Sequence, residues 1–451
     1  MGRFRKTIVS LMVCVLCGPS IASTVDRSER PAPRPEEPRL ASAAAVFSSV
    51  RPIPRNADRA LPSTRESTTT PTTVGANPAA FNRWVADFKR RARASGIRAD
   101  VLDAAFARAE YLPRVVELDR NQNEFTKTLW DYLSTAVSAT RVRNGKAALS
   151  RHSRVLERIE RTYGVKKEIV VAVWGLETSY GGYMGGTSVI SSLATLAFDG
   201  RRGAYFEGEL INALKILQSG DTRPQNMEGS WAGAMGHTQF MPSSFLNYAV
   251  DFTGDGRRDI WGANPADALA STANYLRAFG WKTGQPWGME VQLPQGFDYR
   301  LTGERTKKSA AEWNRLGVRQ MNGQRVPNHG PASILVPGGA GHAAFVIYAN
   351  FQVIEKYNPA DAYVIGIGHL ADRIAGGPAI SGSWPHGDRA LSGDERRELQ
   401  RRLRRAGFDP GKVDGKIGPE TLAAVRGYQA SLGVTVDGYV SLALLNQLRR
   451  R

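Results

Sequence analysis

An almost uninterrupted apolar run near the middle of the 451-residue chain constrains its fold most strongly. The segment Ile169–Glu177 reads I-V-V-A-V-W-G-L-E and contains one charged residue, Glu177. A helix that is apolar on every side is a buried helix, and the Ser-Tyr-Gly-Gly that follows predicts its end. A carboxylate in the last turn of a buried helix loses water, so we expect a raised pKa for Glu177, as a general acid needs. A structural glutamate paired with an arginine is the alternative.

The first residues of the chain have the pattern of a secretory signal. Three basic residues precede an apolar run over residues 7–17, and small residues follow it. We expect a signal peptide over residues 1–23, with a cut near Ala22 or Ser23. The run is too short for a comfortable transmembrane helix, so an uncleaved inner-membrane anchor is the alternative.

Composition then separates a tether from a folded body. Both cysteines of the chain lie inside the predicted signal, so the mature protein would contain no disulfide. Residues 24–79 are rich in Pro, Ser, Thr and Arg and have no apolar period, which is typical of a disordered tether. Folded sequence begins near Phe81 and predicts a mainly α domain over residues 80–375, followed by a Gly/Pro-rich linker at 376–390 and a small module at 391–451.

Periodicity predicts the elements of that body. Apolar residues recur at helical spacing in three segments, Phe81–Ala94, Ala99–Glu110 and Leu149–Tyr163. Strand-like alternation is scarce and is found in Met289–Leu293 and Ser333–Pro337. We therefore expect an α-rich domain with a small β-containing part.

The C-terminal module contains a weak internal repeat. Val413–Leu422 and Val436–Leu445 each begin with Val-Asp-Gly, which predicts a turn followed by a short helix. Together with L-Q-R-R-L-R-R-A-G-F at Leu399–Phe408, the repeat resembles the peptidoglycan-binding type 1 domain. The resemblance implies a three-helix domain that binds stem peptides or glycan. A generic helical module with the same turns is the alternative.

A stretch dense in small and short polar residues runs from Gly229 to Ser244 and reads G-S-W-A-G-A-M-G-H-T-Q-F-M-P-S-S. Its glycines permit close backbone approach to a ligand. Ser230 and Gln239 can offer hydrogen bonds, and aromatic residues beside them can offer apolar faces. Without further information, the stretch is equally consistent with a tightly packed helix junction.

Several motifs together resemble the lytic murein transglycosylase B family, glycoside hydrolase family 103. They are E-T-S-Y-G at Glu177–Gly181, the stretch just described, D-F-T-G-D-G-R-R-D-I-W at Asp251–Trp261, A-N-Y-L at Ala273–Leu276, and N-F-Q-V-I at Asn350–Ile354 with Tyr357 and Asn358. The resemblance implies a lysozyme-like α-rich catalytic domain that acts on peptidoglycan in the periplasm. It implies Glu177 as the catalytic acid/base, and substrate-binding roles for Ser230, Gln239, Tyr275, Tyr357 and Tyr363. Tyr132 is a further candidate for the cleft.

The family's chemistry accounts for a single catalytic carboxylate. An ordinary glycosidase needs two carboxylates, one as acid and one as base or nucleophile. The family cleaves the bond between N-acetylmuramic acid and N-acetylglucosamine without water, so one residue can protonate the glycosidic oxygen and then deprotonate the muramyl C6 hydroxyl. Nearby acidic residues offer a second carboxylate only as the less favoured alternative, namely Asp199, Glu207, Glu209, Asp221 and Glu228.

The segment from Asp251 onward begins like an EF-hand calcium loop. Asp251, Thr253 and Asp255 stand at its positions 1, 3 and 5, and the Arg257 carbonyl would be the next ligand. Gly262 stands where the usual closing glutamate would be, so Asp267 is the favoured closing carboxylate. In the resembled family such a loop supports structure, and an Asp/Gly turn without an ion is the alternative. We expect no required cofactor.

The chain carries 60 Lys+Arg against 42 Asp+Glu, a net charge of +18. This charge favours anionic partners such as wall polymers. Nucleic acid is not expected because of the signal and the wall-binding module, and no zinc-ligand spacing is present. We predict a lytic transglycosylase that works as a monomer on glycan strands and stem peptides. The alternatives are a muramidase that hydrolyses the same bond and a non-catalytic wall-binding scaffold.

Overall fold

The computed structural model describes residues 78–120 and 127–450. The predicted signal peptide and all but the last residues of the predicted tether lie outside these residues. The helices that precede the larger sheet are α1 (Pro78–Ala94), α2 (Ala99–Phe106), α3 (Pro113–Arg120), α4 (Leu129–Ala136), α5 (Ala139–Arg151), α6 (Ser153–Tyr163), α7 (Lys167–Thr178), α8 (Val189–Asp199), α9 (Gly203–Ser219), η2 (Pro224–Asn226), α10 (Pro242–Tyr248) and α11 (Ala266–Ala278). Two short strands, β1 (Thr187–Ser188) and β2 (Glu228–Gly229), pair antiparallel.

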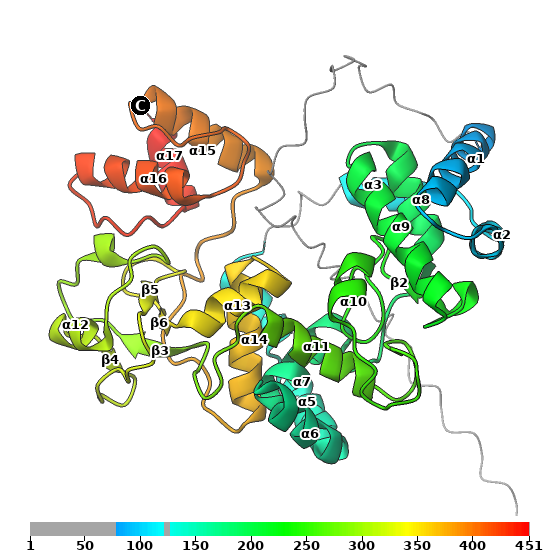
Figure 1. The fold of residues 1–451 in the computed structure, drawn as a ribbon. Helices are drawn as coiled ribbons and strands as arrows, with labels where there is room; N and C mark the ends of the chain where they lie inside the picture. The colour runs from blue at the N-terminus through cyan, green and yellow to red at the C-terminus, as the bar shows by residue number, and fades with distance from the viewer. Residues whose placement is uncertain (1–77, 121–126, 451) are drawn as a thin grey trace, which may run out of the picture. The chain divides into compact units, whose positions relative to one another are not determined.

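The predicted buried helix is the centre of this assembly. Residues Ile169 to Gly175 of α7 are all buried, as the apolar run requires. Helices α5, α6, α11 and α14 (Asp361–Ile374) pack around α7 (Figure 1). Since neighbours cover α7 on several sides, its apolar residues share one continuous core that extends from Phe81 to Ile374.

Two predicted helices differ from the structure in their bounds. The segment 149–163 is divided, because α5 ends at Arg151 and α6 begins after His152, whose φ of −107° and ψ of 18° break the helix. The helix predicted over Ala99–Glu110 ends at Phe106. Beyond it, the Glu110 backbone N–H donates to the Ser191 hydroxyl of α8, so tertiary contacts hold that segment in an extended path.

A four-stranded antiparallel sheet forms the small β part, in the order β4-β3-β6-β5. Its strands are β3 (Gly288–Gln292), β4 (Arg319–Gln320), β5 (Ser333–Leu335) and β6 (Ala344–Ile347). Side chains alternate along a strand, and in β6 Phe345 and Ile347 join the main core while Ala344 and Val346 join a second core. Both faces of β6 are therefore buried, which explains its fully apolar sequence. The elements η3 (Tyr299–Leu301) and α12 (Ala310–Arg315) lie between β3 and β4 in sequence, and α13 (Ala349–Tyr357) follows β6.

The C-terminal module consists of α15 (Gly393–Arg405), α16 (Pro419–Ser431) and α17 (Leu442–Arg449) around its own core. The predicted repeat has a structural counterpart. The Gly415 N–H donates to the buried Gln400 side chain, and the Gly438 N–H donates to Gln429, both at 2.8 Å. Both glycines have left-handed φ values, so each Val-Asp-Gly is a turn before a helix, as predicted.

Candidate active site

Glu177 lies half-buried in the last turn of α7, one residue before the helix ends. The end is abrupt, since Ser179 and Tyr180 both have left-handed backbone, with φ values of 52° and 64°. Residues other than glycine seldom adopt this backbone conformation, so tertiary contacts have to hold it. The Tyr180 ring packs against Gly175, and its hydroxyl donates to the Arg141 carbonyl at 2.7 Å. Glu177 thus lies on a buried helix whose C-terminal end is held in place by tertiary contacts.

Tyr363 is the side chain with a described hydrogen bond to Glu177. Its hydroxyl donates to the Glu177 Oε1 at 2.6 Å, and the residue is only 4% exposed. Burial, together with the Glu177 carboxylate, raises the pKa of Tyr363 well above its usual range. Tyr363 therefore stays protonated and remains a donor. The resemblance assigned this residue to the site, and the structure places it in direct contact with the expected acid/base.

Two other tyrosines that the resemblance assigned to the site pack next to Tyr363 and support its contact with Glu177. The Tyr357 ring stacks on Tyr363 with an interplanar angle of 8°, and its hydroxyl donates to the Thr238 carbonyl. Tyr275 is 3% exposed, packs against Tyr357, and donates to the Lys356 carbonyl. Both hydroxyls have backbone partners in the described structure.

Tyr132 of α4 lies within electrostatic reach of Glu177. Burial raises the pKa of Tyr132 above its usual range, and the Glu177 charge contributes to the shift. Tyr132 also packs against Gly366 on α14, the helix that carries Tyr363. The structure thus brings this further candidate close to the carboxylate.

Ser230 and Gln239 lie at the two ends of a compact loop. The Ser230 hydroxyl accepts from the Ala234 N–H at 3.0 Å. Gln239 has a φ of 54°, and its amide nitrogen donates to the Met184 carbonyl, in the segment that follows Glu177, and to the Gly236 carbonyl. Both side chains are half-buried. Gln239 therefore joins the loop to the segment that follows α7.

His237, between those two residues, is 6% exposed and has partners on both ring nitrogens. Its Nδ1 lies 3.1 Å from the Trp174 Nε1, and its Nε2 lies 2.8 Å from the Gly262 carbonyl oxygen. Burial lowers the pKa of His237 below its usual range. The hydrogen-bonding groups of the His237 ring are thus satisfied by its neighbours.

Four of the five acidic residues considered as a second carboxylate make ion pairs or hydrogen bonds elsewhere. Asp199 pairs with Arg120, Glu207 with Arg91, and Asp221 with Arg258. Glu209 is buried and accepts from the Ser243 N–H and hydroxyl. Glu228 lies in β2 opposite Ser188. Four of these five carboxylates therefore hold helices and loops together.

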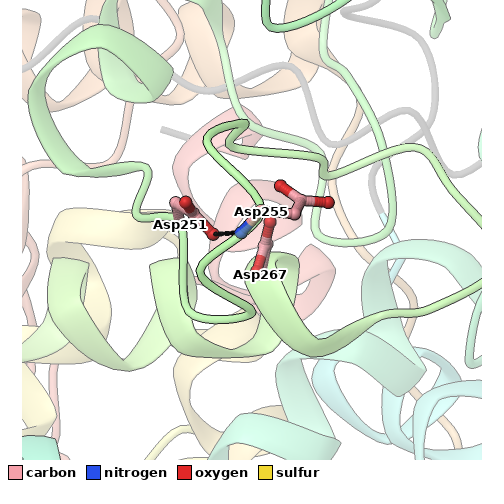
Figure 2. A group of neighbouring side chains, drawn as sticks. All are labelled: Asp251, Asp255 and Asp267. Carbon is pink, nitrogen blue, oxygen red and sulfur yellow. Dashed lines mark hydrogen bonds between the residues drawn. The ribbon is translucent and has the colours of Figure 1, made fainter.

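The predicted calcium loop brings three carboxylates together (Figure 2). Oxygens of Asp251, Asp255 and Asp267 all lie within 4.8 Å of one another. The Thr253 hydroxyl donates to Asp251 at 3.2 Å, so its oxygen belongs to the same cluster, whereas for Arg257 the described contact is a backbone N–H donated to Asp255. Carboxylate oxygens are ligands of the kind that suits Ca²⁺.

Backbone amides already order this loop. The N–H groups of Gly254, Asp255 and Gly256 donate to Asp251, and they lower the pKa of that carboxyl, Gly256 most strongly. Asp267 is buried and accepts from the backbone of Phe252, Thr253 and Asp259, while burial raises its pKa. Asp267 thus joins the two ends of the loop through hydrogen bonds, and its role as the closing ligand stays a prediction.

Sequence reasoning missed a second group of carboxylates, formed by Glu304, Glu355 and Asp361, whose oxygens also lie within 4.8 Å of one another. Burial and the other two carboxylates raise the pKa of Glu355 to about 8. Glu304 comes from a segment far from Glu355 and Asp361 in the chain, so no local motif could reveal the group. Among the described residues, no helix is long and apolar enough to cross a membrane.

Two family models match the chain. Residues 80–372 match the transglycosylase SLT domain, and residues 392–448 match the peptidoglycan binding domain. The membrane-bound lytic murein transglycosylase B of Escherichia coli (strain K12) is 37% identical over 251 residues, which are 54% of this chain and 66% of that relative's length.

Solved structures are also similar. SltB3 from Pseudomonas aeruginosa, in complex with NAG-anhNAM-pentapeptide, is 50% identical, with a TM-score of 0.80 over 82% of this chain and 99% of that chain. The Escherichia coli lytic transglycosylase Slt35, in complex with calcium, is 33% identical, with a TM-score of 0.56 over 66% of this chain and 94% of that chain.

Proposed function

The chain belongs to the transglycosylase SLT domain family, as a lytic transglycosylase of the type of these relatives, and from this premise we propose that Glu177 is its single catalytic acid/base. The enzyme cleaves the bond between N-acetylmuramic acid and N-acetylglucosamine in peptidoglycan without water and leaves 1,6-anhydromuramyl ends. The observation that carries this proposal is the hydrogen bond from the buried Tyr363 to Glu177 at the end of a buried helix.

The reaction needs one proton to travel through one carboxyl group. Protonated Glu177 gives its proton to the glycosidic oxygen, and the C1–O bond breaks to leave an oxocarbenium-like muramyl residue. The resulting carboxylate removes the proton from the C6 hydroxyl, and the C6 oxygen bonds to C1. Glu177 is then protonated again, so the cycle closes without a second carboxylate or a water molecule. The raised pKa of Glu177 remains a prediction.

The surroundings of Glu177 support a mechanism with a single carboxyl group. Tyr363 fixes one carboxylate oxygen and stabilises the charged form between the two proton transfers. The nearby alternatives Asp199, Glu207 and Asp221 are paired with arginines. Ser230 and Gln239 line the part of the site that faces the substrate. Tyr357 stacks on Tyr363 and Tyr275 packs against Tyr357, so these two tyrosines support Tyr363. The compound in the SltB3 complex, NAG-anhNAM-pentapeptide, is of the anhydro type that this route generates.

The remaining parts of the chain give the enzyme its location. The C-terminal three-helix domain binds peptidoglycan, and the signal at residues 1–23 exports the protein to the periplasm.

The acidic loop binds a structural Ca²⁺ through Asp251, Thr253, Asp255, Asp267 and the Arg257 carbonyl. When bound, the ion would neutralise the carboxylates and stiffen the loop. The Slt35 complex with calcium supports this proposal.

Product analysis separates this function from its alternatives. Purified sacculi are digested with wild type and with Glu177→Gln, and the soluble products are analysed by mass spectrometry. We expect anhydromuropeptides from the wild type and none from the variant. Reducing ends, which are heavier by one water, would favour a muramidase. Intact sacculus binding without any cleavage would favour a scaffold.

A further inference from the structure

His237 and the next residue contact both elements that hold Glu177. On one side, the His237 ring accepts from Trp174, three residues before Glu177 on α7, and its carbonyl accepts from the Thr178 hydroxyl at 2.6 Å. On the other side, the Thr238 carbonyl accepts from Tyr357, which stacks on Tyr363. Residues three apart lie on the same helix face, so the Trp174 contact acts on the turn that carries Glu177.

The same histidine is anchored to the chain that leaves the acidic loop. The His237 backbone N–H donates to the Ile260 carbonyl at 2.9 Å, and the ring Nε2 lies 2.8 Å from the Gly262 carbonyl oxygen. Gly181, after the end of α7, packs directly on the ring, where a Cβ would lie 2.6 Å from Nδ1. The ring therefore fills the space between the end of the catalytic helix and the segment 260–262.

The partners also determine the tautomer of the ring. The Trp174 indole can only donate, so Nδ1 must accept, whereas the Gly262 carbonyl can only accept, so Nε2 must carry the proton. The neutral Nε2–H form satisfies both contacts at once. Each nitrogen thus has one separate task, which makes the two contacts separable by substitution.

We propose that His237 is a positioning residue for Glu177, which holds the last turn of α7 through the Trp174 contact. The proposal rests on the assignment of Glu177 as the acid/base. His237 does not need to touch substrate, because both ring nitrogens are occupied by the protein. Its effect on catalysis passes through the direction in which Glu177 points, and small errors in such a direction slow chemistry more than binding.

Two conservative variants separate the two contacts. In His237→Asn the side-chain oxygen can take the place of Nδ1 and accept from Trp174, but the side chain is too short to reach Gly262. In His237→Gln the amide nitrogen can take the place of Nε2 and donate to Gly262, but the Trp174 contact is lost. Each variant loses one buried hydrogen bond, so both should lower the melting temperature by similar amounts.

The measurement is kcat and KM on a soluble glycan strand of defined length, with melting temperatures recorded for every variant. We expect His237→Asn to keep kcat within about threefold of wild type, and His237→Gln to lose at least about tenfold in kcat with KM nearly unchanged. Trp174→Phe removes the same contact from the other side. The double variant Trp174→Phe/His237→Gln should therefore be no slower than His237→Gln alone.

Equal kcat losses in the two histidine variants, or kcat within about twofold of wild type in all folded variants, would overturn the proposal. If His237→Gln does not fold, Trp174→Phe tests the same contact. Glu177→Gln is measured alongside, since its full activity would refute the acid/base assignment itself and leave the histidine result to be interpreted as stability alone.

Discussion

The bond between Tyr363 and Glu177 gives the sharpest quantitative prediction. Tyr363→Phe removes a 2.6 Å hydrogen bond to a carboxylate and leaves the buried ring in place. Hydrogen bonds to charged groups contribute about 1.5–3 kcal/mol, and tenfold in rate corresponds to about 1.4 kcal/mol. If the bond acts fully on the carboxylate formed during the reaction, kcat should fall by about 10- to 150-fold.

The same substitution should change the pH profile in a known direction. A donor to a carboxylate favours its charged form, so losing the Tyr363 hydroxyl raises the pKa of Glu177 relative to wild type. The alkaline limb of the kcat profile, where the acid form is lost, should therefore move to higher pH. The profile is measured on soluble glycan strands, with anhydromuropeptide release as the readout.

Tyr348→Phe is a matched control, because Tyr348 is also fully buried and donates to a backbone carbonyl, that of Pro327, in the second core. Its kcat should equal that of wild type even if its stability falls. The reasoning would be refuted if Tyr363→Phe matched this control within about twofold in kcat, or if the loss appeared in KM alone.

Three further predictions concern stability and binding. Asp251→Ala should reduce the rise in melting temperature that calcium produces, measured by calorimetry against a chelator; an unchanged calcium response would contradict the metal assignment. Because Glu304 and Asp361 help burial to raise the pKa of Glu355 to about 8, the free energy of unfolding should fall as pH rises from about 5 to about 8. Glu355→Gln should flatten that part of the profile measured by denaturant titration, and an unaltered slope would count against the raised pKa of Glu355. Arg401→Glu/Arg405→Glu, on the exposed side of α15, should weaken sacculus pull-down at low salt but not at high salt; salt-independent loss would indicate misfolding.

Local pattern predicted α7 well, because its apolar run permits only a buried helix. The run Ile169–Gly175 is buried, and the helix ends at Thr178, before the predicted Ser-Tyr-Gly-Gly. The two predicted β segments are also strands in the structure: β3 begins one residue before its predicted range, and β5 lies within its predicted range. These are cases in which the local period and the tertiary packing agree.

Boundaries set by distant contacts were less predictable. The break at His152 interrupts a segment whose apolar spacing continues, and α2 ends early because residues of α8 bind the backbone that follows. In the C-terminal domain, the repeat was visible in Val-Asp-Gly, but the buried glutamines that bind each turn were not. Nothing in a local pattern reveals which distant group will satisfy a given backbone N–H.

The site shows the same division. Burial and sequence position made Glu177 a candidate, and the resemblance favoured it over a structural glutamate. The role of Tyr363 came only from the resemblance, since 186 residues separate the two. The contact between Trp174 and His237 carried no sequence signal beyond the presence of a histidine beside small residues. The cluster of carboxylates in the acidic loop was predictable because Asp251 and Asp255 are nearly consecutive, and only Asp267 had to be inferred across a gap.

The central claim is that one carboxyl group cleaves the glycan without water, and isotope labelling tests it most directly. Sacculi are digested in water enriched in ¹⁸O, and the released muropeptides are weighed by mass spectrometry. The account predicts anhydromuramyl ends at their ordinary mass, without ¹⁸O, because the C6 oxygen of the sugar itself closes the ring. Muramyl reducing ends that carry ¹⁸O in the primary products would contradict it and would require a water-activating group in addition to Glu177.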